Sequence, residues 1–421
     1  MAVPRTGILV ALDTDHRRGE MVAAMPFSGQ LVRPERVGDV VSPAYDALTQ
    51  EQRRRYRTDH PLSYLHVTRS APDEDDGSTI DDHTLVTRGR ASLERILAAG
   101  VFAPVGEPAV VVYELEHGEH RQRGVVIEVA GSEFRARAKP HEATQPDRTA
   151  LLAEHSLIVR AASSPVACTV AAGHALDEVV SGVDVRPPAV EHRSDDGLVQ
   201  RVWLLEAAAT AAAIAALADQ QLYIIDGHHR AAANAQLLER GFEVPLLVAV
   251  FTPSSLGLAG FHRLLRLPED LAPAEYVRRV SRRFRVTPTD DLVPPSAGTV
   301  VIGTGSGWHH VEFDERPVAG GPLIRLGSTD PCIVERELIG AIGGRDGPVD
   351  VVYMPDEGGL DVVVDEAKRL GRVPILLAPV TIDDVIEVAD GGLTMPPKST
   401  YFTPKVRSGL FLLRYDEIFD S

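Results

Sequence analysis

The stretch LYIIDGHHRAAANAQLLERG, residues 222–241, predicts a strand, a tight turn and a helix in direct succession. It opens on an apolar run with β-branched and aromatic members, which is typical of a buried strand, and Asp226-Gly227 ends that run. The helix is expected to begin at His228 and to stop before Gly241. The stretch therefore favours an α/β fold with a polar turn at a strand end.

Three titratable or cationic side chains, those of His228, His229 and Arg230, occupy the first turn of the expected helix. A helix start carries unpaired N–H groups and a partial positive charge, which suits a phosphate or carboxylate beside Gly227. Ligands of open α/β sheets bind beyond the carboxyl ends of strands. A purely structural interpretation stays open, in which Asp226 caps the helix and the other side chains are solvated.

The composition is that of an ordinary globular protein. The chain has 421 residues, 44% of them hydrophobic and 24% charged, so two or three domains are expected. The net charge of −17 and the pI near 5.3 argue against a general nucleic-acid or anionic-membrane surface. We expect a small-molecule substrate as the partner, with no nucleic acid and no membrane, and the oligomeric state stays open.

Cysteine usage and hydropathy bear on the compartment. Cys168 and Cys332 lie far apart and match no zinc spacing, so a reducing environment is expected. The N-terminus lacks a signal-peptide pattern, and no run of 18 apolar residues occurs. These features predict a cytoplasmic protein.

We expect a mixed α/β (α+β) organisation in three parts. Residues 1–24 form a loose leader, residues 25–268 an α/β domain that carries the stretch above, and residues 269–421 a C-terminal α/β region. Residues 395–409 of that region are expected to return to the site. Residues 222–252 are expected to form one strand-helix-strand unit, right-handed if its strands are parallel.

A second polar stretch, ARAKPHEATQPDRTA at 136–150, is a Pro-broken loop that leads into a helix. Its Glu142 and His141 form a candidate acid/base pair, because a carboxylate beside an imidazole tunes both groups. Lys139 and Arg148 add positive charge. A surface loop with capping residues remains the alternative.

A third polar stretch, MPPKSTYFTPK at 395–405, carries two lysines that flank hydroxyl groups, a pattern suited to phosphate or carboxylate recognition. An ordinary loop before a terminal strand is equally open here. His262 and Arg263 follow the strand at 245–252 and are expected to face the same crevice. Asn234 is the sole asparagine of the chain, which draws attention to it.

Four ordered motifs together resemble a bacterial and archaeal family known as a domain of unknown function, DUF1015, and labelled by its DGHHR motif. The motifs are SPAYD at 42–46, KPHE at 139–142 with Asp147-Arg148, IDGHHR at 225–230 and MPPKSTYF at 395–402. Ala44 departs from the family, which usually has a second proline there. The resemblance spans roughly residues 25–413.

The strand–DGHHR–helix unit is also similar to the phosphate-binding box of the ParB/sulfiredoxin-like fold. That fold includes free serine kinases, which transfer a phosphoryl group from a nucleotide to serine. The resemblance implies a ParB/sulfiredoxin-like nucleotide-binding core with an additional mixed sheet and helices.

The leading hypothesis is a nucleotide-dependent phosphotransferase, a small-molecule kinase acting on a hydroxylated metabolite such as a serine-like amino acid. ATP or ADP and Mg²⁺ would be its cofactors, with the metal ligands left open. The candidate site residues fall into catalytic, nucleotide-binding and substrate-binding groups: Asp46, Glu142, Asp226 and His228; Gly227, His228, His229, Arg230, Asn234, Lys398, Ser399 and Thr400; and Tyr45, Lys139, His141, Arg148, His262, Arg263, Tyr401 and Lys405.

Two other hypotheses remain. A non-catalytic nucleotide or metabolite sensor would use the same anion site. A metal-dependent hydrolase would use Asp226, His228, His229 and His262, although adjacent histidines usually point in different directions. A ParB-like DNA-binding role is disfavoured by the acidic charge.

Overall fold

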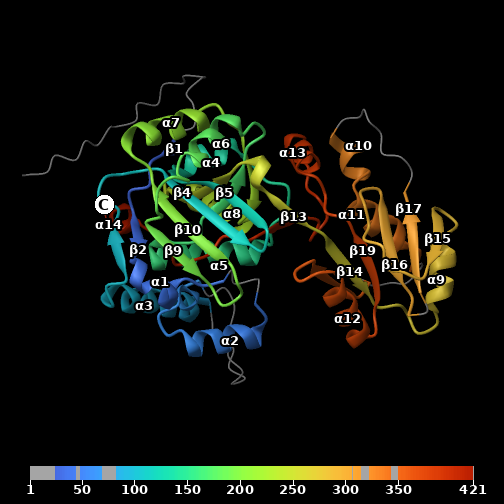
Figure 1. The fold of residues 1–421 in the computed structure, drawn as a ribbon. Helices are drawn as coiled ribbons and strands as arrows, with labels where there is room; N and C mark the ends of the chain where they lie inside the picture. The colour runs from blue at the N-terminus through green and yellow to red at the C-terminus, as the bar shows by residue number, and fades with distance from the viewer. Residues whose placement is uncertain are drawn as a thin grey trace, which may run out of the picture.

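The computed structural model describes residues 24–43, 48–68, 82–305, 307–313, 322–342 and 349–420, and they form a mixed α/β fold. Figure 1 shows two lobes, with β4, β5 and β10 in one and β14, β16 and β17 in the other. The expected fold class is confirmed. None of the described helices combines the length and apolar composition that a membrane crossing requires.

The first lobe is built on a nine-stranded sheet, here called the first sheet. Its order is β6-β11-β8-β12-β5-β4-β10-β9, and β1 pairs with β5. The strands are β1 (Ala24–Met25), β4 (Val111–His117), β5 (His120–Val129), β6 (Ala138–Lys139), β8 (Val166–Thr169), β9 (Val190–Arg193), β10 (Val199–Leu204), β11 (Leu222–Asp226) and β12 (Leu246–Phe251).

Helices pack on this sheet, and most of the described helices of the protein lie in the first lobe (Figure 1). One apolar cluster joins alternate strand residues to α4, α6 and α7, and another joins the opposite face to α3 and to the C-terminal strand β21. The helices of this part are α1 (Val37–Val40), α2 (Gln50–Asp59), α3 (Asp82–Ala98), α4 (Gly131–Arg137), α5 (Pro146–Val159), α6 (His174–Ser181), α7 (Ala207–Leu217) and α8 (His228–Glu239).

The second lobe contains a six-stranded sheet with the order β15-β17-β16-β19-β14-β18. Separate apolar clusters cover its two faces, one of them with α12. Its elements are β14 (Phe261–Leu265), α9 (Pro273–Val280), β15 (Arg285–Thr289), β16 (Thr299–Gly303), β17 (Trp308–Glu312), α10 (Pro322–Gly327), α11 (Asp330–Ile333), β18 (Val351–Pro355), α12 (Leu360–Leu370) and β19 (Val373–Leu377). Helix α13 (Ile382–Asp390) follows β19 and packs on an apolar cluster of the first lobe.

The chain then returns to the first lobe. Strand β20 (Tyr401–Thr403) pairs with β13 (Gly257–Ala259) between the lobes. Strand β21 (Phe411–Arg414) joins a four-stranded sheet of order β3-β2-β21-β7, and α14 (Asp416–Asp420) follows. The partner strands of β21 in that sheet are β2 (Gln30–Val32), β3 (Phe102–Pro104) and β7 (Ala161–Ala162).

The predicted unit at 222–252 differs from the observed one in strand order. Strands β11 and β12 flank β8, which pairs antiparallel with β11 and parallel with β12. The two strands of the unit are therefore antiparallel and not adjacent, so the right-handed parallel crossover does not apply. The strand between them comes from residues 166–169, which a local pattern around residue 222 does not reveal.

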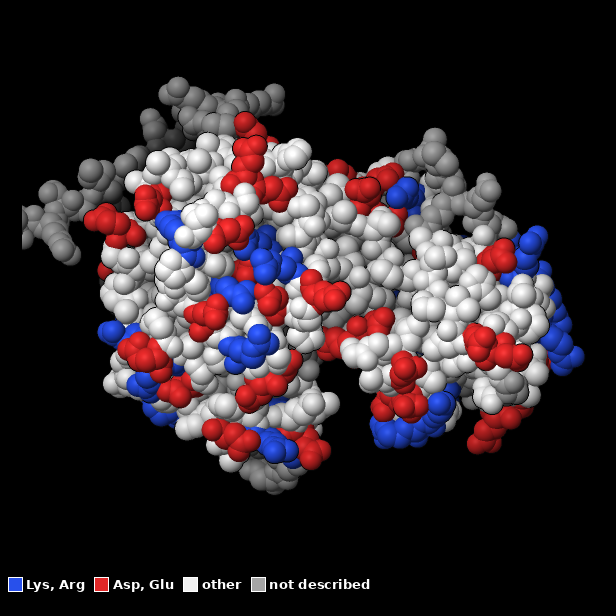
Figure 2. Space-filling model, viewed as in Figure 1, with Lys and Arg blue, Asp and Glu red and all other residues white. Residues whose placement is uncertain are grey.

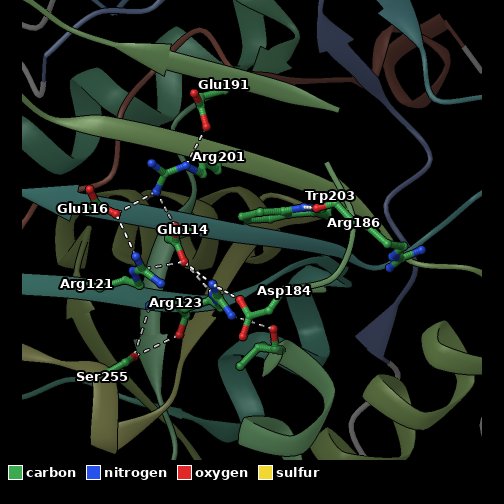
Figure 3. A network of polar contacts seen from close by, with 11 residues as sticks. Glu114, Glu116, Arg121, Arg123, Asp184, Arg186, Glu191, Arg201, Trp203 and Ser255 are labelled. Carbon is green, nitrogen blue, oxygen red and sulfur yellow. Dashed lines mark hydrogen bonds and ion pairs between the residues drawn. The ribbon is translucent and has the colours of Figure 1, made fainter. Parts of the chain in front are cut away.

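A network of charged side chains crosses the first sheet (Figure 3). Glu114, only 1% exposed, accepts hydrogen bonds from Arg123 Nε and Arg201 Nη1, each at 2.7 Å. Both arginines are its cross-strand register partners. Asp184 and Glu116 take further contacts from the same arginines. The network thus favours this register of β4, β5 and β10 at the point where the charged side chain of Glu114 is buried.

Replacing Glu114 by glutamine is expected to lower the free energy of unfolding by about 2 kcal/mol. Removing one charge of a buried network costs several kcal/mol, and this value is reduced because both arginines keep another carboxylate. Urea denaturation measures the change. Glu366→Gln is the matched control, since that carboxylate pairs at the surface with the exposed Arg369 and its loss should leave stability nearly unchanged. Equal losses in the two variants would contradict the assignment.

Candidate functional site

The turn between β11 and α8 is built around Gly227. Its backbone is left-handed, with φ 95° and ψ 24°, a conformation that favours glycine, and no side chain caps the helix that follows. The first helical hydrogen bond runs from Ala231 N to Gly227 O at 3.0 Å. The N–H groups of the three preceding residues therefore have no acceptor within the helix, as expected from the sequence.

This helix start opens into a cavity of about 760 Å³ lined by residues of both lobes. The surface is also indented between the lobes, where acidic and basic side chains are interspersed (Figure 2). The sequence-predicted residues that line the cavity are Glu142, Arg148, Asp226, Gly227, His228, His229, Arg230, Asn234, Lys398, Thr400, Tyr401 and Lys405. Three segments distant in the sequence thus meet at one cavity.

Asp226 and Arg230 pair with each other across the turn. Arg230 Nη2 donates to Asp226 Oδ2 at 2.6 Å, and Arg230 Nη1 donates to the carbonyl of Ser164 at 2.8 Å. Lys405 Nζ lies 3.8 Å from the other oxygen of Asp226. Asp226 is therefore already neutralised by cations, and Arg230 fastens the turn to the segment before β8.

Glu142 is the carboxylate in the most unusual surroundings. Thr400 Oγ1 donates to its Oε1 at 3.3 Å, and His228 Nδ1 lies 3.7 Å from its Oε2. Burial raises the pKa of Glu142, and Asp226 raises it further, whereas Lys398, Thr400 and Lys405 act in the opposite direction. A carboxylate whose pKa is raised in this way is a candidate acid or base.

The two adjacent histidines face different elements. His228 is buried, and its Nε2 accepts the backbone N–H of His141 at 3.5 Å, which leaves the proton on Nδ1, facing Glu142. His229 Nε2 accepts the N–H of Gln145 at 3.1 Å, at the start of α5. Within the described ranges, no group of three or more His, Cys, Asp or Glu residues is arranged to hold a metal ion.

Lys398 has a backbone conformation that is rare for a residue with a side chain, with φ 58°. Arg263 Nη1 donates to the Lys398 carbonyl at 2.9 Å, and Lys398 Nζ lies 5.6 Å from the ring centre of Phe261. Lys405 Nζ lies 5.4 Å from the ring centre of Tyr401. Both ammonium groups are thus held at the cavity against aromatic faces.

Five other candidates lie away from the cavity lining. Lys139 pairs with Asp390 at 2.7 Å on the outside of β6, and Ser399 Oγ donates to the Pro396 carbonyl. His141 is fully buried behind the cavity.

His262 and Arg263 are buried inside β14 of the second sheet, so the expectation that they face the crevice is wrong. The sequence located the end of β12 correctly but carried no information that the next strand joins another sheet. Asn234 lines the cavity, yet its amide donates to the Val244 carbonyl at 2.8 Å. Tyr45 and Asp46 lie outside the described residues.

Sequence reasoning missed the wall that the second lobe contributes. The cavity is lined by Phe261, Tyr353, Met354, Pro355 and Glu357, and the Tyr401 hydroxyl donates to Glu357. The sequence offered one signal for this wall. A strand ends at residue 355, and two carboxylates, Asp356 and Glu357, follow it directly. Arg148, by contrast, was expected, and its Nε is buried in the cavity wall with no hydrogen-bond partner in the part of the chain that the structure describes.

The buried histidines predict a loss of stability in acid. Burial lowers the pKa of His228 to about 3 and that of His262 to about 4, from an ordinary 6.5. As the pH falls, the unfolded chain therefore binds protons before the folded protein does. The stability that the two neutral histidines contribute is complete above about pH 6.5 and is lost as the pH falls toward 3 to 4. Each site should contribute a slope of about 1.4 kcal/mol per pH unit in that window.

Urea unfolding followed from about pH 7 to about pH 5 measures this slope. His228→Asn is expected to reduce the proton uptake on unfolding by about one proton. An unchanged slope in that variant would mean that His228 is protonated in the folded protein.

Comparison with known proteins gives one family and several distant structures. The family model described as "Protein of unknown function (DUF1015)" matches residues 24–329, and no curated protein matches. The structure of a free serine kinase in complex with AMP is 12% identical to this chain, with a TM-score of 0.35, and the match covers 70% of this chain and 93% of the kinase. A variant of a free serine kinase with ADP has 14% identity and a TM-score of 0.34, covering 70% and 94%.

A conserved hypothetical protein from Pyrococcus furiosus has 11% identity and a TM-score of 0.33, covering 70% of this chain and 97% of its own. Because these TM-scores are low, the chemistry of the cavity is inferred from its own residues.

Proposed function

The chain belongs to the DUF1015 family, and we propose that it is a nucleotide-dependent phosphotransferase acting on a small hydroxylated metabolite. The observation that carries the proposal is one shared cavity. A carboxylate with a raised pKa, Glu142, lies there with an uncapped helix start and two lysines. Phosphoryl transfer needs these two things, a group that takes the acceptor's proton and fixed positive charge around the phosphates.

The phosphates would lie against the N–H groups at the start of α8. Lys398 and Lys405 are the cations of the cavity that aromatic rings hold in place, and both lower the pKa of Glu142, so they act within electrostatic reach of it. Arg230 would contribute less to phosphate binding, since Asp226 and a carbonyl occupy its donors. Its role would be to hold the turn.

Glu142 would act as the general base. The acceptor hydroxyl would give its proton to the Glu142 carboxylate while its oxygen forms a bond to the terminal phosphorus. The bond from that phosphorus to the bridging oxygen would break, and this oxygen would leave with the shortened nucleotide. His228 is not suited to take the proton, because burial lowers its pKa to about 3.

The carboxylates Glu142 and Asp226 at the cavity do not fit a magnesium ion, because both oxygens of Asp226 are engaged by Arg230 and Lys405 and Glu142 would be the base. Mg²⁺ is usually held by one or two carboxylates that are free to bind it together with the phosphates. The positive charge around the phosphates would therefore come from Lys398 and Lys405.

Arg148 would bind the acceptor. Its buried Nε, which has no hydrogen-bond partner among the described residues, suits a carboxylate, which would make a hydroxy acid or a serine-like amino acid the preferred acceptor class. The nucleotide would then occupy the side of the cavity that Lys398 and Lys405 line.

A thermal-shift screen of nucleotides, with hydroxy amino acids and hydroxy acids as second ligands, tests the proposal. Stabilisation by a nucleotide together with a phosphorylated product is the expected result. Stabilisation without product over long incubation would indicate a sensor instead. Absence of stabilisation by every nucleotide would refute the proposal.

A further inference from the structure

His141 lies directly behind the proposed base, although the sequence suggested that it binds substrate. Its side chain is fully buried, and it packs edge-on against the ring of His228 at 4.6 Å between centres. Its Nε2 lies 3.0 Å from Thr400 Oγ1. Because His141 does not line the cavity, an effect on bound ligands has to pass through another side chain.

We infer that His141 is a positioning residue that holds Glu142 for proton transfer through the hydroxyl group of Thr400. This inference rests on the proposed role of Glu142 as the base. The three side chains form a continuous line, with 3.0 Å from His141 to Thr400 and 3.3 Å from Thr400 to Glu142.

The direction of the hydrogen bonds follows from the number of protons available. A hydroxyl group has one proton, and Thr400 donates it to Glu142 Oε1. Thr400 must then accept from His141, whose Nε2 carries the proton. Burial, together with the nearby His228, lowers the pKa of His141 well below its ordinary value, so the ring is neutral and carries a single N–H.

This arrangement leaves His141 Nδ1 buried without a hydrogen-bond partner among the described residues. A buried unsatisfied nitrogen is costly and calls for an explanation. Here the explanation is that the one ring proton is committed to Thr400, which orients its own proton toward the ionised carboxylate. The line therefore favours ionised Glu142 against the burial that disfavours it.

The backbone brings the same groups together from both sides. Glu142 forms a parallel bridge with Met395, and Met395 N donates to the His141 carbonyl at 2.8 Å. The segment that carries Thr400 is thus fastened to the segment that carries His141 and Glu142, although they are far apart in sequence. This connection gives the hydroxyl a fixed place between the two side chains.

The test measures the pKa of Glu142 itself by carbon-13 NMR of protein labelled at the glutamate carboxyl, with the signal assigned by loss in Glu142→Gln. Thr400→Val is expected to raise this pKa by about one unit, because the ionised form loses its donor. Thr400→Ser, which keeps a hydroxyl group, should restore the wild-type value. A lowered or unchanged pKa in Thr400→Val would overturn the inference.

A double-mutant cycle then tests whether His141 acts through Thr400. His141→Leu alone should raise the pKa of Glu142, and His141→Gln, whose amide can donate from the position of Nε2, should raise it less. In the Thr400→Val background, His141→Leu should cause no further change. Additive shifts would mean that His141 acts on Glu142 directly, which contradicts the inference.

The same variants separate this inference from the proposed function, because the NMR titration requires no substrate. If the pKa values shift as expected but no nucleotide is turned over, the hydrogen-bonded line stands and the proposed function fails. If turnover is found, the acidic limb of its pH profile should move to higher pH by the same amount in Thr400→Val.

Discussion

Replacing Glu142 by glutamine is expected to lower kcat about a thousandfold while nucleotide binding is retained. An amide cannot accept the proton of the acceptor hydroxyl, and a general base contributes on the order of a hundredfold to ten-thousandfold to the rate. Glutamine keeps the size of the side chain and can still accept from Thr400, so the cavity should keep its shape. Product formation gives kcat, and the nucleotide-dependent shift in Tm reports binding.

Glu133→Gln is the matched control for this variant. Glu133 is a glutamate on α4, 38% exposed and outside the cavity lining, so its loss should leave both readouts unchanged. A Glu142→Gln protein that retains more than about a tenth of the wild-type kcat would contradict the role of Glu142 as base.

Replacing Lys398 by methionine should reduce kcat/KM for the nucleotide by about a hundredfold. Methionine keeps the length of the side chain but removes the charge, and fixed charges in a closed site contribute on the order of a hundredfold to a thousandfold in rate. The rare backbone conformation of Lys398, fastened by Arg263, places the ammonium group at the cavity. Initial rates over a range of nucleotide concentrations give the value.

Lys368→Met is its control, because Lys368 is exposed on α12 and pairs there with the exposed Asp365. Equal effects of the two substitutions would show that general positive charge, and not the position of Lys398, governs the reaction. Wild-type kinetics in Lys398→Met would remove Lys398 from the proposed anion site.

Local patterns in the sequence predicted the centre of the site well. The apolar run before Asp226 forms β11, Gly227 makes a left-handed turn, and α8 begins at His228. Each of these features depends on neighbouring residues, since strand length, glycine conformation and helix start are set within a few positions. The sequence also singled out the lysines at 398 and 405, because two cations beside hydroxyl groups form a recognisable pattern, and both lysines line the cavity.

Features that depend on distant contacts could not be predicted. The position of β8 between β11 and β12 is set by packing across the sheet, and His262 enters a second sheet that no local signal announces. Asp226 and Arg230 are only four residues apart, on either side of the turn, yet their pairing, which balances the charge of the carboxylate, could be seen only in the geometry. For the same reason Glu142 could be separated from the other candidate bases only once its neighbours were known.

A crystal structure with a non-hydrolysable nucleotide analogue tests the central claim most directly. The account predicts that the terminal phosphate accepts hydrogen bonds from the backbone N–H groups at the start of α8, with the Lys398 ammonium group in contact. Glu142 should then lie between that phosphate and the space beside Arg148. A phosphate ordered away from residues 226–230 would contradict the account.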